Sequence, residues 1–430
     1  MEPELHHFLP RPGVSSPVVL VLQLENHIGL TLTRALGRQG IFCLGVSYKG
    51  HAFGCSSRYL KGYAACRPLN EKEMIATTMK LIAIAQPDFV MAVSESLMRQ
   101  LNEHRSLLPE KTKLLFAEQH ILDLAFDKSS VLSIAKRLHI PTPALYSPED
   151  IWMSKSLPAE AEFPLVLKPP RAYEDHPWKA RSFQYKHCSS AREVLDLLER
   201  FSGAPFFPLV QEYCPGHGVG VELCMHEGEP IAAFQHERIR ENPPTGGVSV
   251  MRRSVPLTDV LFRDSVRLLK AMDWQGVAMV EYRYDPTTKR YWLMEVNGRF
   301  WGSLSLPVLC GVNFPYVLLE SMGFGRPPRK KLGEYPINVK CQQLSADLHW
   351  LMTVAQMSPA KVYRAVGMTK WRCIRDVLVD VLRCPYHDVE WFDDLLPAIQ
   401  FWKERVVNAL SRKPLPHSVR PAMEEAPKKG

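Results

Sequence analysis

The chain has 430 residues, more than one average domain, with 46% hydrophobic and 23% charged residues and a formal net charge of +8. This composition is that of an ordinary globular protein. The positive charge is spread out with no long Lys/Arg block, so nothing indicates a nucleic-acid-binding tract, and a mild positive balance suits small anionic substrates. No apolar run reaches the roughly 20 residues of a membrane span, and residues 1–13 lack the pattern of a signal peptide. We therefore expect a cytoplasmic protein of two or three domains without membrane or nucleic-acid partners, and a homodimer is left open.

Residues 17–122 alternate between strand and helix patterns, after a leader over residues 1–16 that we expect to be loose. The pattern predicts strands at 17–24, 41–47 and 89–93 and helices at 29–39, 71–85 and 95–104. Such βαβα alternation is typical of a parallel sheet with helices on both faces. The first turn, LENHIGL, lacks the Gly-x-Gly-x-x-Gly spacing, so no dinucleotide site is predicted there.

The ten cysteines are scattered and include no Cys-x-x-Cys pair. Zinc-ribbon and thioredoxin-type sites therefore lack their basic spacing. Most of the cysteines lie within apolar segments, as Cys43, Cys224 and Cys310 do. We interpret them as reduced, buried thiols.

The most informative segment is a predicted hairpin whose strands, 276–284 and 290–296, flank the turn Asp-Pro-Thr-Thr-Lys. Side chains alternate along a strand, so Glu281, Glu295 and Asn297 are expected on one face. Two carboxylates and an amide oxygen suit Mg²⁺ held together with substrate phosphates. Arg299 follows at the next same-face step and suits a phosphate or carboxylate. The alternative is a surface hairpin whose glutamates face water.

Two lysines upstream lie at the ends of predicted elements. A helix within residues 125–143 has Asp127 near its start and Lys128 in its first turn, where the helix dipole does not favour a cation. The apolar strand 163–168 ends at Lys168. Each lysine is either a solvated side chain or a point charge for bound phosphates.

Between the lysines and the hairpin lie two glycine-containing turns. Residues 208–224 predict two apolar strands around a Pro-Gly-His-Gly turn, in which glycines permit the tight turn. The QEYC run there can present backbone groups to a planar base in a hinge, or it belongs to a plain hairpin. A strand at 231–240 ends in Arg238 and Arg240, and with the loop 243–249, PPTGGVS, these arginines can face an anionic substrate.

Beyond residue 328 the pattern becomes helical. Apolar stretches at 348–354 and 394–407 predict amphipathic helices that pack on the main body, with a partner-binding or substrate-capping role as the alternative. We expect a helical C-terminal extension over 329–412. Residues 413–430 are Pro-rich and charged and are expected to be disordered.

Taken together, these pieces resemble the ATP-grasp superfamily over residues 17–328. The motifs are DK before an IPTP exit, a strand ending in LKP, QEYCPG, PPTGG, and VEY followed by MEVNGRFWGS. The resemblance implies a fold of the α/β and α+β class, with an N-terminal preATP-grasp parallel-sheet domain over 17–122. An ATP-grasp domain would follow over 123–328, with its ATP-binding subdomain at about 145–215.

The resemblance also implies an ATP-binding role for five residues. Lys128 and Lys168 would contact the nucleotide phosphates, and Glu212, Tyr213 and Cys214 would surround the adenine. The latter two would act mainly through their backbone.

By the same resemblance, Glu281, Glu295 and Asn297 would hold one or two Mg²⁺ ions, with Mn²⁺ as an alternative. Arg299 and Lys168 would serve the transfer itself, Arg299 by steadying the transferred phosphoryl group or a substrate carboxylate. Most members join a carboxylate to an amine, or less often a thiol, through an acyl phosphate made from ATP. Such phosphoryl transfer depends on positioning and on neutralising spread negative charge.

Two features depart from the family pattern. No glycine occurs between Lys168 and Gly203, where a flexible glycine-rich lid is common, and the insert instead carries basic residues (Arg171, Lys179 and Arg181). One interpretation is that these three basic residues close over the nucleotide phosphates. The alternative is that the lid is altered or impaired. Gly298 replaces a frequent proline and is expected to loosen the backbone. The alternatives to a ligase are an ATP-grasp kinase and a nucleotide-binding protein without turnover.

Overall fold

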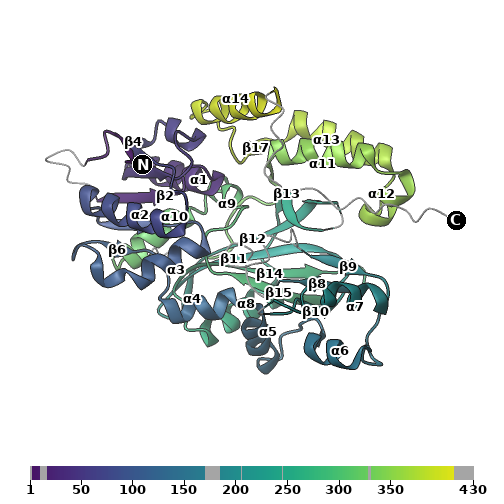
Figure 1. Ribbon diagram of the computed structural model, residues 1–430. Helices are drawn as coiled ribbons and strands as arrows, with labels where there is room; N and C mark the ends of the chain where they lie inside the picture. The colour runs from purple at the N-terminus through teal and green to yellow at the C-terminus, as the bar shows by residue number, and fades with distance from the viewer. Residues whose placement is uncertain are drawn as a thin grey trace.

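A computed structural model describes residues 2–9, 17–169, 185–204, 206–244, 246–327 and 331–410. Three sheets with their helices make up this part of the chain (Figure 1). No helix within these ranges is long and apolar enough to cross a membrane. All ten cysteines are buried and free, as the sequence predicted.

The first sheet has six strands in the order β1-β4-β3-β2-β5-β6. Its strands are β1 (Glu4–His6), β2 (Val18–Leu22), β3 (Phe42–Ser47), β4 (Leu60–Ala65), β5 (Phe89–Met91) and β6 (Lys113–Leu114). The accompanying helices are α1 (His27–Gly37), α2 (Glu71–Ala85), α3 (Glu95–Glu103) and the short 3₁₀ turns η1 (Phe53–Ser56) and η2 (Arg105–Leu107). Among β2 to β6 every pair of neighbouring strands is parallel, which confirms the predicted parallel sheet.

The prediction of a loose leader is wrong for Glu4–His6. This segment forms β1, which pairs antiparallel with β4 at the edge of the sheet. A Cβ at Gly62 would lie 2.0 Å from the carbonyl oxygen of His7, so the absence of a side chain there lets the leader lie against β4. Residues 10–16 of the predicted leader are outside the described residues.

The second sheet is antiparallel and has the order β7-β10-β8-β9. It consists of β7 (Leu145–Tyr146), β8 (Leu165–Lys168), β9 (Lys186–Cys188) and β10 (Leu209–Glu212), covered by α6 (Pro148–Ser154) and α7 (Ala191–Glu199). Its small core includes Leu165, Leu167 and Val210. Lys168 is the last residue of β8, as predicted.

The third sheet has seven strands in the order β15-β14-β11-β12-β13-β16-β17. They are β11 (His217–His226), β12 (Glu229–Asn242), β13 (Val248–Ser254), β14 (Gly276–Tyr284), β15 (Tyr291–Asn297), β16 (Lys340–Gln342) and β17 (Tyr386–His387). The associated helices are α4 (Gln119–Phe126), α5 (Lys128–Arg137), α8 (Asp259–Ala271), α9 (Ser305–Leu309), α10 (Phe314–Leu318) and a π-helical turn, η5 (Leu319–Gly323). Val219, Val221 and Leu223 of β11 are buried in the main core, so the face they share is apolar. Gly218, Gly220 and Glu222 alternate with them and lie on the opposite face.

The helix predicted within residues 125–143, with Asp127 near its start, is α5, and a separate helix, α4, ends just before it at Phe126. The Asp127 carboxylate accepts hydrogen bonds from the backbone amides of Ser129 and Ser130 and so caps α5. Lys128 is therefore the first residue of a new helix.

The C-terminal region is helical, as predicted, with α11 (Leu344–Gln356), α12 (Pro359–Val366), α13 (Lys370–Arg383) and α14 (Leu396–Leu410). It also supplies β16 and β17 to the large sheet, so residue 328 does not separate two independent sheets. Figure 1 shows α14 beside the N-terminal elements. The ring centroids of Phe401 in α14 and Phe53 in η1 are 5.1 Å apart. Residues 413–430, predicted as a disordered tail, lie outside the described residues.

Candidate nucleotide-binding site

The predicted hairpin exists as β14 and β15 and brings three oxygen donors together. Glu281 is directly opposite Glu295, and Met279 is opposite Asn297. Directly opposed residues share a face, so Glu281, Glu295 and Asn297 converge on one side of the sheet, as predicted. The Asn297 side-chain amide donates to Glu295 Oε1 at 3.3 Å.

Lys128 reaches these carboxylates from α5. Its Nζ lies 2.8 Å from Glu295 Oε2, and the two side chains are only 18% and 28% exposed. Burial disfavours both charges, but each stabilises the other, so the pKa of Lys128 is raised and that of Glu295 is lowered to about 2. Lys128 is thus not the solvated surface lysine of the alternative interpretation.

Lys168 faces the same carboxylates from the second sheet. Burial, followed by repulsion from Lys128, lowers the pKa of Lys168 to about 8, although Glu295 and Glu281 act in the opposite direction. Lys128 comes from helix α5 and Lys168 from strand β8 of the second sheet, and both act on one acidic cluster. This arrangement brings anionic and cationic groups together at one site.

Arg238 is a further member of the cluster that the sequence did not connect to the hairpin. It is paired with Glu281 and also donates to Glu241 Oε1 at 3.1 Å and to the Gly247 carbonyl at 3.0 Å. Burial raises the pKa of Glu281, Arg238 counteracts this, and Glu295 reinforces it. Each of the two carboxylates therefore forms an ion pair, Glu281 with Arg238 and Glu295 with Lys128.

The glycines of β11 explain how Arg238 reaches across the sheet. A Cβ at Gly218 would lie 2.6 Å from Arg238 Cδ, and one at Gly220 would lie 2.4 Å from the His236 ring. These two glycines stand inside the strand and clear space for side chains of β12, so their predicted role in a tight turn is wrong. Glycines at alternate strand positions are a sequence signal of such close approach.

Arg240, in contrast, is not part of this cluster. A β-bulge in β12 separates it from Arg238. Its guanidinium donates to both oxygens of Asp347 and to Asp380 Oδ2, and the residue is 6% exposed. The prediction that Arg240 faces an anionic substrate is wrong, because its charge joins β12 to α11 and α13.

The QEYCPG segment connects two different sheets. β10 belongs to the second sheet and β11 to the third, so the plain hairpin and the predicted pairing of these strands are both wrong. Gly216 provides the turn with φ +93°, and a Cβ there would lie 2.0 Å from the Tyr284 carbonyl oxygen. A short crossing between two sheets is what a hinge requires.

The three residues expected around adenine point in different directions. The Glu212 carboxylate accepts from the Ala144 amide at 3.0 Å. The Tyr213 ring is partly exposed and contacts the His187 ring at 5.4 Å. Cys214 is buried and forms a small apolar cluster with Trp292 and Met294 of β15.

Arg299 lies beyond the end of β15, so strand alternation does not extend to it. Its Nε is 3.3 Å from Glu95 Oε1 of α3, and its NH1 donates to the Phe300 carbonyl at 3.0 Å. The Glu95 charge also raises the pKa of Lys128, which places this pair near the cluster. Arg299 therefore links α3 of the N-terminal sheet domain to the acidic cluster of Glu281 and Glu295.

Gly298 has a steric role that the sequence did not show. A Cβ there would lie 2.4 Å from Trp274 Cη2 and 3.1 Å from Ala125 Cβ. The expected loosening of the backbone is not the reason for this glycine, because its φ is not positive and its surroundings are tightly packed.

The loop after β12 contains two glycines and contacts Arg238. Gly246 and Gly247 have φ of +121° and +150°, conformations that other residues rarely adopt. The Gly247 carbonyl is one of the acceptors of Arg238. The basic residues Arg171, Lys179 and Arg181 of the insert lie outside the described residues, so the lid prediction stays a prediction.

Comparisons with known proteins give one family model and several relatives. Residues 207–343 match the model of a family described as ATP-grasp in the biosynthetic pathway with Ter operon. D-aspartate ligase from Enterococcus faecium (strain Aus0004) is 20% identical over 249 residues, which span 55% of this chain and 59% of that relative. The match therefore covers less than two thirds of the relative's own length.

Two solved structures share the fold. Biotin carboxylase from Campylobacter jejuni, in a β-γ-ATP complex, gives a TM-score of 0.59 with 13% identity over 75% of this chain and 74% of that chain. L-amino acid ligase from Bacillus licheniformis gives a TM-score of 0.52 with 14% identity over 71% of this chain and 74% of that chain. At such identities the likeness concerns the fold.

Proposed function

The chain belongs to the ATP-grasp superfamily, and on that basis we propose that it is an ATP- and Mg²⁺-dependent ligase that joins a carboxylate to an amine or thiol. The observation that carries this proposal is the convergence of Glu281, Glu295 and Asn297 with Lys128 and Lys168. An acyl phosphate would be the intermediate, and ADP and phosphate would be released. The relatives support the chemistry, since two of them are named as ligases of amino acids.

The donor set fits Mg²⁺. Two carboxylates and an amide oxygen are hard ligands, and Mg²⁺ typically takes one or two carboxylates together with substrate phosphates. Bound there, Mg²⁺ would neutralise charge on the transferred phosphoryl group. Glu281, Glu295 and Asn297 would hold it, and Mn²⁺ accepts the same donors.

Two cations pair with these carboxylates and would compete with the metal for them. Lys128 is paired with Glu295, and Arg238 is paired with Glu281. ATP phosphates offer Lys128 a second anionic partner, which would free Glu295 to act as a ligand. Nucleotide and metal would therefore bind cooperatively, because each removes a competing interaction of the other.

Lys168 and Arg299 are the residues that we assign to the transfer itself. Lys168, on a different sheet from the carboxylates, would follow the phosphates as the two sheets move about Gly216. Arg299 would exchange Glu95 for the substrate carboxylate or the phosphoryl group. Both cations would stabilise negative charge that is spread over the transferring group.

The nucleotide base would enter between the second and third sheets. Cys214, Trp292 and Met294 provide an apolar surface beside Lys168, since Cys214 and Lys168 influence each other electrostatically. The backbone of Tyr213 and Cys214 would contact adenine. The Glu212 side chain would instead hold Ala144 and so keep β10 in place.

A screen of carboxylic acids with ATP, Mg²⁺ and hydroxylamine tests the proposal, since hydroxylamine traps an acyl phosphate as a hydroxamate. We expect at least one acid to give hydroxamate and free phosphate with wild-type protein, and none with Glu295→Gln. Glu110→Gln, a substitution of an exposed glutamate, is the matched control and should behave as wild type. Phosphate transferred to a hydroxyl substrate would indicate a kinase, and ATP binding without ADP formation would indicate a protein without turnover. Either result would refute the ligase.

A further inference from the structure

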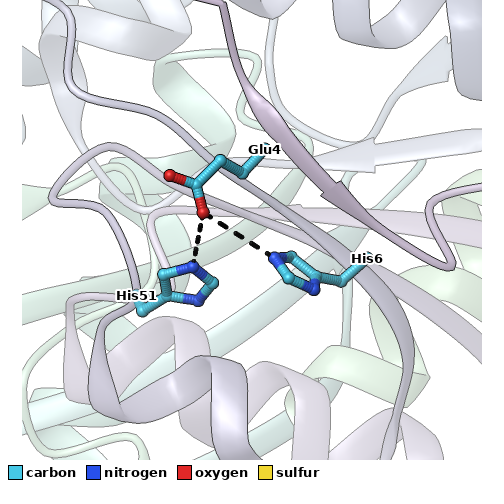
Figure 2. A group of neighbouring side chains, drawn as sticks. All are labelled: Glu4, His6 and His51. Carbon is cyan, nitrogen blue, oxygen red and sulfur yellow. Dashed lines mark hydrogen bonds and ion pairs between the residues drawn. The ribbon is translucent and has the colours of Figure 1, made fainter.

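A second cluster of ligand-type side chains lies at the edge of the N-terminal sheet, on elements that the proposed nucleotide site does not use. Glu4 and His6 belong to β1, and His51 belongs to the loop after β3. Glu4 Oε2 lies 2.8 Å from His51 Nε2 and 4.0 Å from His6 Nε2, and Figure 2 shows both rings turned toward this carboxylate. We propose that Glu4, His6 and His51 form a Zn²⁺ site.

The donor types favour Zn²⁺ over the Mg²⁺ of the nucleotide site. Two imidazole nitrogens and one carboxylate oxygen suit a borderline metal, whereas Mg²⁺ prefers oxygen alone. The three ligand atoms lie within 4.8 Å of one another. Tetrahedral bonds of about 2.0–2.1 Å place ligand atoms about 3.3 Å apart, and the separations of 2.8 and 4.0 Å lie on either side of that value. The side chains are partly exposed and can make this small adjustment.

Tyr63 of β4 orients both imidazoles. Its hydroxyl lies 3.2 Å from His51 Nδ1, which directs Nε2 of that ring toward Glu4. Its ring stacks on His6 with a centroid separation of 4.6 Å and an interplanar angle of 16°. Outer groups that fix a ligand imidazole in this way are a regular part of metal sites.

His6 Nε2 gives an independent indication of a missing ligand. This nitrogen is buried, and it has no hydrogen-bond partner, since the 4.0 Å to Glu4 is too long for one. A buried, unsatisfied polar atom costs free energy. A metal ion between His6, His51 and Glu4 would satisfy it.

The backbone holds the two halves of the cluster together. β1 pairs with β4 so that Glu4 is opposite Ala65 and His6 is opposite Tyr63. His51 follows Gly50, whose φ of +72° forms the turn after β3. The site therefore lies near the carboxyl ends of β3 and β4. Bound Zn²⁺ would attach β1 to the rest of the sheet.

With three protein ligands, a fourth position would be left for water or an anion. Arg67 adds positive charge close to this cluster. A Cβ at Gly50 would lie 2.6 Å from its Nε, and its charge acts on Glu4 together with those of His6 and His51. This positive charge favours an anionic fourth ligand.

The test uses the untagged full chain after chelator treatment, with Zn²⁺ affinity measured by competition against a chromogenic chelator. We expect one Zn²⁺ equivalent in the wild type and its loss in His6→Ala and in His51→Ala, with unchanged circular dichroism. Tyr63→Phe keeps the stacked ring but removes the hydroxyl, and it should weaken binding by about 10- to 100-fold.

Two control variants make the result specific. His120→Ala removes a histidine that is 73% exposed and 3.8 Å from Glu118 but belongs to no three-ligand group among the described residues, and it should retain the Zn²⁺ equivalent. Glu295→Gln should also retain it, since it alters only the nucleotide site. Retention of wild-type binding by His6→Ala or His51→Ala, or loss of the equivalent in Glu295→Gln, would overturn the proposal.

Discussion

The titration of Lys168 provides a sharp test of the nucleotide site. Burial and the neighbouring Lys128 lower its pKa from 10.5 to about 8. Bound phosphates would favour the charged form and restore a high pKa. ATP binding should therefore be accompanied by proton uptake at this lysine.

The amount of uptake follows from the pKa of about 8. The neutral fraction of Lys168 is about 0.1 at pH 7, about 0.5 at pH 8 and about 0.9 at pH 9, and each fraction equals the protons taken up when ATP binds. Because only the charged form is competent, apparent ATP affinity should fall about twofold at pH 8 and about tenfold at pH 9 relative to its low-pH value.

Calorimetry of ATP binding in buffers of different ionisation enthalpy measures this uptake directly. Lys168→Arg keeps a charge that does not titrate in this range, so its proton uptake should be close to zero from pH 7 to 9. Lys186→Met, at an exposed position of the neighbouring strand β9, should show the wild-type profile. A wild-type profile without uptake at pH 8 to 9, or the same profile in Lys168→Arg, would refute the assignment.

Three further predictions concern stability and are measured by urea unfolding. Gly298→Ala should lower the free energy of unfolding by about 1–3 kcal/mol, since its Cβ would lie 2.4 Å from Trp274 Cη2; an unchanged value would show that Trp274 moves freely. Arg252→Met should cost about 3–5 kcal/mol because it leaves Asp388 buried without its partner. Burial opposes ionisation of Asp388, but Arg252 outweighs it and lowers the pKa of Asp388 below 3.8, so this stabilisation is present above pH 3.8 and lost as the pH falls through the lower folded value. The difference between variant and wild type should therefore shrink in acid, and a constant difference would contradict this cause. Asp127→Ala should lower the free energy of unfolding by about 0.5–2 kcal/mol through loss of the cap of α5. An unchanged free energy of unfolding would show that the start of α5 does not depend on this cap.

Local patterns predicted the elements of this fold well. The hairpin of β14 and β15 followed from alternation and turn chemistry, and strand alternation predicted the shared face of Glu281 and Glu295, although their direct opposition depends on a register shift after Glu281. The parallel N-terminal sheet followed from the βα alternation. In both cases the pattern within each short segment determines its secondary structure, although the pairing of β2 with β5 joins residues far apart in sequence.

The errors arose where distant segments decide the outcome. Arg238 and Arg240 look equivalent in sequence, but a bulge in β12 separates them. Arg238 pairs with Glu281, whereas Arg240 pairs with Asp347, more than 100 residues away. The crossing at Gly216 resembles a hairpin in sequence. The two possibilities are distinguished only by the structure, in which β10 and β11 belong to different sheets. Gly298 is explained by Trp274, which no local pattern connects to it.

The cluster of Glu4, His6 and His51 was missed for a similar reason. His51 is 47 residues from Glu4, and the leader was interpreted as loose. Acidic and histidine residues close together in the leader were a signal, but their partner could be found only after β1 was paired with β4.

The central claim is that Glu281 and Glu295 bind a magnesium nucleotide together with the lysines. Equilibrium binding of ATP, with and without Mg²⁺, to wild type, Glu281→Gln and Glu295→Gln tests it most directly. We expect wild-type binding to depend on Mg²⁺ and each variant to weaken it by at least about tenfold, roughly 1.4 kcal/mol. ATP binding that is independent of Mg²⁺ and unchanged in both variants would contradict the claim.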